Sequence, residues 1–103
     1  MESEDIGRNL SAGRYELSRH ALQRIVERNI SQAEIEEAGR TLELIEDYPE
    51  DKYAPSFLVL GFTENHRPLH LQVCYTDPDM LKVITVYEPS AGQWIDNRIR
   101  RQP

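Results

Sequence analysis

The amino-acid sequence predicts an α+β domain in which two N-terminal helices pack on an antiparallel sheet of about four strands, followed by a short C-terminal helix or tail. Two early stretches combine capping residues with apolar residues at helical spacing. Four later stretches are apolar or alternating, and turn residues separate them. With 103 residues, the chain is long enough for one modest core. We therefore expect a single domain at residues 14–101, after a mobile arm at residues 1–13 that shows no periodicity.

The two predicted helices are recognisable by the residues at their ends. Ser18 is a suitable N-cap for a helix that continues to about Arg28, and Asn29 favours a stop because asparagine tolerates left-handed backbone. Ser31 and Glu34 have the spacing of a capping box at the start of the second helix. The apolar faces of the two helices comprise Ala21, Leu22, Ile25 and Val26 in the first and Ile35, Ala38 and Leu42 in the second.

The pattern changes to that of strands after the second helix. Asn, Pro and Asp residues at 64–68 and 77–79 favour turns between apolar stretches. Trp94 is expected to anchor a short helix or docked tail near the C-terminus, and residues 15–17 are expected to be a short extended lead-in to the first helix. The predicted strands are residues 42–46, 56–63, 69–75 and 81–87.

The overall composition is typical of a soluble globular protein, with 39% apolar and 29% charged residues. No apolar run approaches the roughly 20 residues of a membrane-spanning helix, so we expect no membrane association. The start of the chain is acidic and polar, which argues against a secretory signal. Cys74 is the single cysteine, and a chain without an internal disulfide suits the reducing cytoplasm.

The net charge of −6 is unevenly distributed along the chain. Residues 31–64 hold nine acids and two bases, a net charge of −7, whereas residues 65–103 hold four acids and five bases, a net charge of +1. An acidic chain is a poor general ligand for nucleic acid, because phosphate contacts need Lys and Arg. Two interpretations stay open: a local basic surface from the two ends of the chain, or an acidic surface that docks a basic partner.

His20, Arg24 and Arg28 have the i, i+4, i+8 spacing of one polar stripe on the first predicted helix. A cationic row beside a buried helix face is able to hold a phosphate. The alternative is structural, with His20 hydrogen-bonded locally and the arginines paired with Glu27 or with acids of the second helix.

The strand at residues 69–75 places His70, Gln72 and Cys74 on one face and apolar residues on the other. His70 is therefore a candidate acid or base, although an ordinary half-exposed strand residue has the same pattern. Tyr87 ends the next strand, where its hydroxyl either points into a groove or only accompanies a packed ring. His66, His70 and Cys74 are evenly spaced, but strand residues four apart are separated by about 13 Å, so we expect no zinc site. The sequence has no Gly-rich phosphate loop, and we expect no cofactor.

Several motifs of the chain resemble those of a bacterial domain-of-unknown-function family. Ser18-Arg19-His20-Ala21, Arg24 and Glu27-Arg28-Asn29-Ile30-Ser31 resemble its "HA..R..ER.I" signature, and Pro68–Leu71 and Ile84–Pro89 resemble its later strands. With Trp94 and the terminal arginines, the resemblance covers residues 15–101. Members of the family are similar to the BrnT and MqsR toxins, which have a RelE-type ribonuclease fold.

This resemblance implies a curled, RelE/BrnT-like sheet and a toxin of a type II toxin–antitoxin system that cleaves mRNA without a metal. It implies His20 or His70 as base or acid, Arg24 and Arg28 as phosphate ligands, and Tyr87 as an assisting donor. The implied partners are RNA and a cognate antitoxin, with a zinc-finger-containing protein as a candidate for the latter. The alternative is a non-catalytic interaction module that binds a partner through its acidic helix face. Both functions are compatible with a homodimer.

Overall fold

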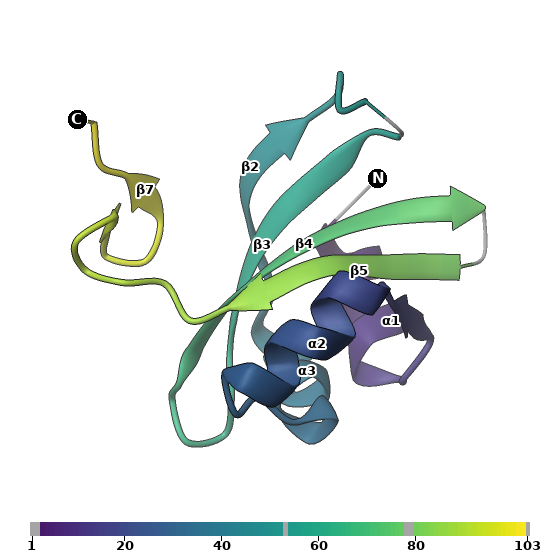
Figure 1. Ribbon diagram of the computed structural model, residues 1–103, viewed down its shortest axis with the longest axis horizontal. Coiled ribbons are helices and arrows are strands. Elements are labelled where there is room, and N and C mark those ends of the chain that lie inside the picture. Colours follow the sequence, from purple (N-terminus) through teal and green to yellow (C-terminus); the bar gives the residue numbers. More distant parts are fainter. Residues whose placement is uncertain (1–2, 53, 78–79, 103) are drawn as a thin grey trace.

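Three helices cover one face of a five-stranded sheet, and a small β-hairpin lies beyond the end of the sheet on the other side (Figure 1). The structure is a computed structural model that describes residues 3–52, 54–77 and 80–102. The helices are α1 (Ser3–Ser11), α2 (Arg19–Glu27), α3 (Gln32–Ala38) and the 3-10 turn η1 (Gly39–Thr41). The strands are β1 (Tyr15–Leu17), β2 (Glu43–Tyr48), β3 (Ser56–Phe62), β4 (Pro68–Asp77), β5 (Met80–Tyr87), β6 (Trp94–Ile95) and β7 (Ile99–Arg100).

The main sheet is mixed, with strand order β1-β5-β4-β3-β2. Strands β2 to β5 pair antiparallel, but β1 pairs in parallel with β5, so that Tyr15 lies opposite Leu81 and Leu17 opposite Val83. The predicted antiparallel sheet of about four strands with two helices is therefore wrong. The lead-in at residues 15–17 is a strand, but its partner lies more than sixty residues away, and a three-residue pattern does not reveal such a pairing.

Helix α1 occupies most of the segment that was predicted to be a mobile arm. Ile6 and Leu10 lie four residues apart, face the core, and are only 1% and 0% exposed. The helix approaches η1 so closely that a Cβ atom on Gly7 would lie 2.6 Å from the carbonyl oxygen of Gly39. A stretch with two large apolar residues and two glycines has too weak a periodicity to predict a helix, and packing against η1 and α3 supplies the missing stabilisation.

The caps of α2 and α3 are confirmed. The Ser18 hydroxyl accepts a hydrogen bond from the Ala21 amide at 2.9 Å. Ser31 and Glu34 form both bonds of a capping box, and Asn29 closes the preceding turn with a φ of 55°. These caps depend on residues three positions apart, which is why the sequence alone predicts them. They fix the α2–α3 corner that later forms one side of the candidate site.

The C-terminal segment forms the β6–β7 hairpin rather than the predicted short helix or docked tail, and its Trp94 is buried. Trp94 pairs with Arg100 and Ile95 with Ile99, and the Arg98 amide donates to the Ile95 carbonyl at 3.0 Å. Asp96 and Asn97, the two residues at the tip, have φ angles of 53° and 61°. Asp and Asn tolerate this left-handed backbone at the tip of a hairpin, so the Asp-Asn pair was an overlooked hairpin signal.

The main core lies between the helices and one face of β3, β4 and β5. Leu69, Leu71 and Val73 of β4 point into it and are 0% exposed, which confirms the predicted alternation of that strand. None of the described helices has the length and apolar character that crossing a bilayer requires.

The packing of α3 on β3 gives a first testable prediction. Gly61 lies against the end of α3, and a Cβ atom there would overlap the Ala38 carbonyl oxygen. We expect Gly61→Ala to lower the free energy of unfolding by about 1–3 kcal/mol or more, because backbone must move to make room. Gly92→Ala is the matched control, since among the described residues no atom beyond its chain neighbours lies within 4 Å of the added Cβ. Equal denaturation midpoints for the two variants would contradict this close approach.

Candidate functional site

Two adjoining hollows lie at the end of β5, between the α2–α3 corner and the C-terminal hairpin. Their volumes are about 570 and 340 Å³, and Tyr87 and Gln93 line both. We call them together the arginine groove. Its remaining lining residues are Arg28, Arg67 and Glu88 in the first hollow and Gly92, Trp94, Arg100, Arg101 and Gln102 in the second.

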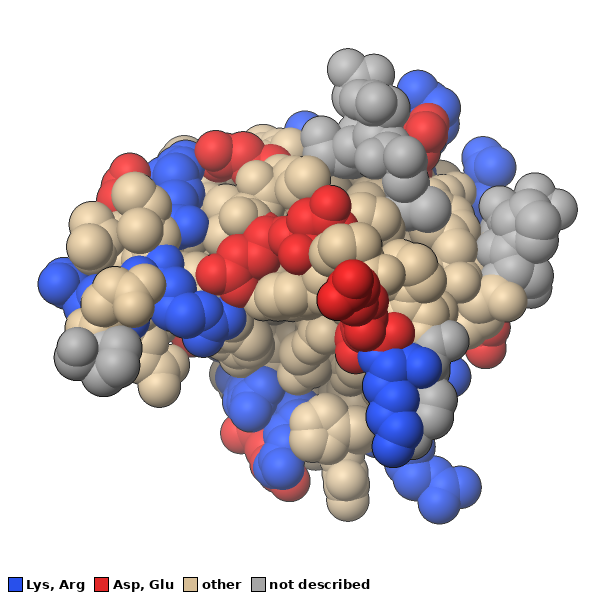
Figure 2. Space-filling view, turned by 90° about the horizontal axis from the view of Figure 1, so that it is seen from above, with Lys and Arg blue, Asp and Glu red and all other residues tan. Residues whose placement is uncertain are grey.

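The groove concentrates positive charge in an acidic protein. Four of its lining residues are arginines, whereas the chain as a whole carries a net charge of −6. Figure 2 shows Lys and Arg side chains gathered at the end of the molecule where the C-terminal hairpin lies, next to a row of acidic side chains that crosses the face. Other Lys and Arg side chains lie along the lower and right margins of this view, so the hairpin end is one of several basic areas around the acidic row.

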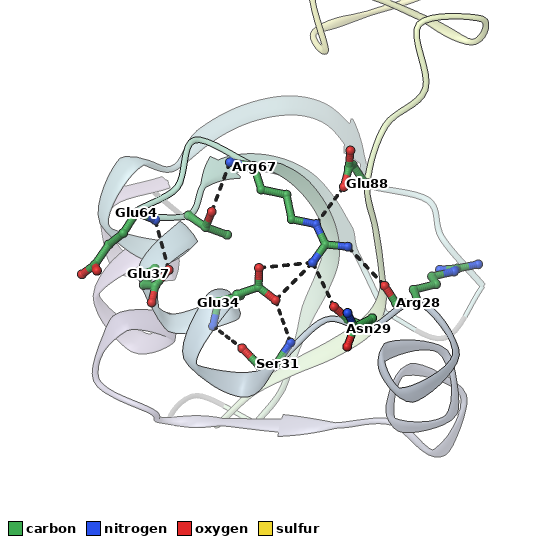
Figure 3. Close-up of polar contacts among 9 residues, drawn as sticks. Arg28, Asn29, Ser31, Glu34, Glu37, Glu64, Arg67 and Glu88 are labelled. Carbon is green, nitrogen blue, oxygen red and sulfur yellow. Dashed lines mark hydrogen bonds and ion pairs between the residues drawn. The ribbon is translucent and has the colours of Figure 1, made fainter.

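Arg67 joins the parts of the fold that form the first hollow (Figure 3). Its Nη1 donates to both carboxylate oxygens of Glu34, at 3.1 and 3.2 Å, and to the Asn29 carbonyl at 3.0 Å. Its Nη2 donates to the Arg28 carbonyl at 3.2 Å, and its Nε donates to Glu88 at 2.7 Å. One guanidinium thereby connects the α2–α3 corner, the α3 capping box and the residue that follows β5.

The contact with Arg67 changes the acidity of Glu34. Partial burial acts to raise the pKa of Glu34, but hydrogen bonds from Ser31 and Arg67 and the positive charge of Arg67 outweigh it and hold the pKa below its ordinary value. Glu34 is therefore an ionised partner for Arg67 at neutral pH. Sequence reasoning did not single out Arg67, because it lies in a turn and its partners come from three other segments.

His70 lies behind the groove and holds the Tyr87 hydroxyl. Its Nε2 is 2.6 Å from the Asn97 carbonyl oxygen, and its Nδ1 is 3.1 Å from the Tyr87 hydroxyl. Because a carbonyl only accepts, Nε2 carries the proton, and in the neutral ring Nδ1 accepts from Tyr87. The His70 ring also makes edge contacts with the rings of Tyr87 and Trp94, at centroid distances of 5.3 and 4.4 Å.

The protonation of this pair suits hydrogen bonding better than proton transfer. His70 is 0% exposed, and burial lowers its pKa below the ordinary value, although the Asn97 carbonyl and Glu46 oppose this effect. Burial also raises the pKa of Tyr87. Both directions favour the neutral pair, in which the proton stays on the Tyr87 hydroxyl.

The structure brings together only some of the predicted site residues. Arg28 and Tyr87 line the same hollow, and His70 supports Tyr87 from behind. His20 is exposed in the first turn of α2, about 12 Å from Arg28 along the helix axis. Arg24 forms an ion pair with Glu27 at 2.8 Å, which is the structural alternative considered for it. His20 and Arg24 therefore do not line the groove.

His66 and Cys74, which lie four residues before and after His70, differ in their exposure to solvent. His66 is exposed in the β3–β4 turn, whereas Cys74 is 7% exposed and burial raises its thiol pKa. Within the described ranges, no three His, Cys, Asp or Glu side chains are grouped as they would be around a metal ion.

These features define a class: a small α+β domain with three helices on one face of a mixed sheet and an arginine-lined groove at the end of its fifth strand. Residues 17–88 match the family described as "Domain of unknown function (DUF4258)". The chain belongs to this family. The matched segment runs from the end of β1 to the residue after β5, so that α1 and the C-terminal hairpin lie outside it. No curated protein and no solved structure matched the chain.

The connections of Arg67 give a second prediction. Replacing Arg67 by Gln should lower the free energy of unfolding by about 1.5–3 kcal/mol, because Glu34 and two backbone carbonyls lose a charged donor. Arg40→Gln is the matched control. Its ion pair with Glu64 is solvent-exposed on both sides, and such pairs contribute at most about 1 kcal/mol. Chemical denaturation of the two variants should separate them; similar midpoints would show that Arg67 is not a structural centre.

The burial of neutral His70 gives a third prediction. Its pKa is lower in the folded protein than the ordinary value of about 6.5, so the unfolded chain binds the proton more readily. This contribution to stability is complete above about pH 6.5 and is lost as the pH falls through the folded-state pKa. Chemical denaturation between about pH 8 and pH 5.5 should show the free energy of unfolding fall as the pH is lowered, in a range above that where the carboxylates titrate. His70→Gln should lack this change, and an unaltered profile would contradict the assignment.

Proposed function

We propose that this protein is the toxin of a bacterial type II toxin–antitoxin pair and that it cuts RNA in the arginine groove without a metal ion. The observation that carries the proposal is the gathering of Arg28, Arg67, Arg100 and Arg101 around Tyr87 in an otherwise acidic chain. RNA phosphates require cations of this kind, and guanidinium groups bind them through paired N–H donors.

The resemblance to BrnT- and MqsR-like toxins supports the same function. The "HA..R..ER.I" motif spans α2 and the α2–α3 corner, and Arg28, its last arginine, reaches the groove. The motif thus supplies both the α2–α3 corner and a cation for the proposed site. The proposal includes a cognate antitoxin as partner, with a zinc-finger-containing protein as a candidate.

Arg28 and Arg101 are the arginines assigned to the scissile phosphate. Arg28 uses Nη1 for the Val86 carbonyl at 2.7 Å, and Arg101 uses Nε for the Ala91 carbonyl at 2.8 Å, which leaves each with further N–H donors. Arg67 has most of its donors occupied and serves to hold the site together. Tyr87 is assigned as a hydrogen-bond donor to a phosphate oxygen.

Glu88 is the carboxylate of the groove and is assigned as the general base. One of its oxygens accepts from Arg67 Nε, and the other stays available to take the proton of the ribose 2′-hydroxyl. The 2′-oxygen attacks phosphorus, the bond from phosphorus to the 5′-oxygen breaks, and water in the open groove protonates the leaving oxygen. The products are a 2′,3′-cyclic phosphate and a 5′-hydroxyl end. The assignment leaves His20 and Arg24 outside the reaction and His70 in a supporting position.

The alternative of a non-catalytic module with an acidic docking helix has weaker support. Glu34 is paired with Arg67, Glu36 accepts from the Tyr15 hydroxyl at 3.1 Å, and Glu37 accepts from the Glu64 amide at 3.0 Å. The carboxylates of α3 thus have partners within the chain, so a basic partner would have to compete with these contacts.

The test is cleavage of RNA by purified protein in the presence of EDTA, with product ends analysed. We expect 2′,3′-cyclic phosphate ends, and we expect Arg28→Gln combined with Arg101→Gln to lower the cleavage rate by about 100-fold or more. Arg19→Gln combined with Arg40→Gln is the matched control: it removes the same charge from exposed positions outside the groove.

Three outcomes would overturn the proposal. They are intact RNA with the unaltered protein, activity that disappears with EDTA, or equal losses in the two double variants. Inducible expression in a bacterium gives a second measurement, because a toxin should arrest growth and the adjacent antitoxin gene should restore it.

A further inference from the structure

The C-terminal hairpin supplies one wall of the arginine groove, although it lies outside the segment that matches the family. Gln93, Trp94, Arg100 and Arg101 come from the hairpin or the residues next to it, whereas Tyr87 ends β5. The connection from β5 to β6 passes through Glu88-Pro89-Ser90-Ala91-Gly92-Gln93 and, in the part of the chain that the structure describes, pairs with no strand of the main sheet. The position of the hairpin wall relative to the main sheet therefore depends on side-chain contacts.

Most of the polar contacts that hold the hairpin are solvent-exposed. Arg98 pairs with Glu43 at 2.9 Å, and Arg100 pairs with Glu46 at 2.9 Å. The arginine side chains of these pairs are 36% and 53% exposed, so water and salt weaken both ion pairs. Each arginine binds its carboxylate through two nitrogens, so the pairs orient the hairpin toward β2, but both remain open to weakening by salt.

The contacts of His70 with the hairpin are buried. His70 is 0% exposed and Trp94, which packs edge-on against it, is 2% exposed. The bond from His70 Nε2 to the Asn97 carbonyl reaches the tip of the hairpin, and Nδ1 holds Tyr87 on the opposite wall. One imidazole ring thus uses its two nitrogens to connect the two walls of the groove.

We infer that His70 is a positioning residue that seats the C-terminal hairpin against β4 and sets the relation of Arg100 and Arg101 to Tyr87. The part of this inference that concerns RNA rests on the proposed function; the seating of the hairpin does not. His70 touches no substrate in this arrangement and acts through Tyr87 and the hairpin.

The experiment compares three single variants of the full chain. His70→Leu fills the buried position with an apolar side chain and removes both hydrogen bonds of the imidazole ring. His70→Gln offers one donor and one acceptor in place of the two ring nitrogens. His66→Gln is the matched control, because His66 is exposed and does not line the groove.

Trp94 is the single tryptophan of the chain and reports directly on the seating of the hairpin. In His70→Leu we expect a red shift of its emission and easier quenching by acrylamide, with the far-ultraviolet circular dichroism of the helices retained. His70→Gln should recover much of the unaltered signal, and His66→Gln should match it. A folded His70→Leu in which Trp94 stays shielded would overturn the inference.

Binding of a short single-stranded RNA that cannot be cleaved, with deoxyribose at the scissile position, measures the effect on the groove. We expect His70→Leu to weaken it about tenfold or more, because misplaced donors lose most of their contribution, and His70→Gln to restore part of it. Unchanged affinity in His70→Leu would overturn the link between His70 and the groove. No binding by the unaltered protein would instead refute the proposed function, while the Trp94 signal would still decide the seating.

A measurement on the unaltered protein tests the inference even if the His70→Leu variant does not fold. Nitrogen-15 spectra of the histidine rings should show His70 protonated at Nε2 and unprotonated at Nδ1 at neutral pH, with its ring N–H protected from exchange. A rapidly exchanging His70 ring proton would contradict the buried bridge without any substitution.

Discussion

The Arg67 guanidinium lies where the α2–α3 corner, the β3–β4 turn and the end of β5 meet, and the geometry of the groove depends on this junction. Backbone carbonyls at Arg28 and Asn29 point toward it because α2 has just ended and its last carbonyls lack helical partners. Glu34 serves two purposes, since its carboxylate closes the capping box and also binds Arg67. The residue that caps α3 thereby also connects this helix to Arg67, which lies more than thirty residues away in the sequence.

The two faces of β4 are closed by different parts of the chain. The face with Leu69, Leu71 and Val73 is covered by the helices and forms the main core. The opposite face would leave His70 half-exposed in an ordinary antiparallel sheet, but the C-terminal hairpin covers it and places Trp94 against the imidazole. A residue that the strand pattern marks as a candidate acid or base thus becomes a buried link between two walls.

The charged side chains fall into two groups, those paired within the chain and those that keep free hydrogen-bond donors. The acids of α3 and β2 are largely taken up by contacts within the chain, among them Glu34 with Arg67 and Glu46 with Arg100. Arg28 and Arg101 keep spare donors because their partners are single backbone carbonyls. The net charge of the chain therefore says little about the groove, where the balance is set by which arginines are already paired.

The sequence by itself determined the features that depend on neighbours within a few residues. The Ser18 cap, the Ser31–Glu34 capping box and the alternation of β4 were predictable because local backbone donors and side-chain periodicity define them. Tertiary structure alone decided the parallel pairing of β1 with β5, the burial of α1 and the enclosure of His70. Each of these brings together segments far apart in the chain, and its stability comes from packing that no single segment encodes. For the candidate site, Arg28 and Tyr87 were within reach of pattern reasoning, whereas Arg67 and the hairpin arginines join them only through the folded arrangement of the chain.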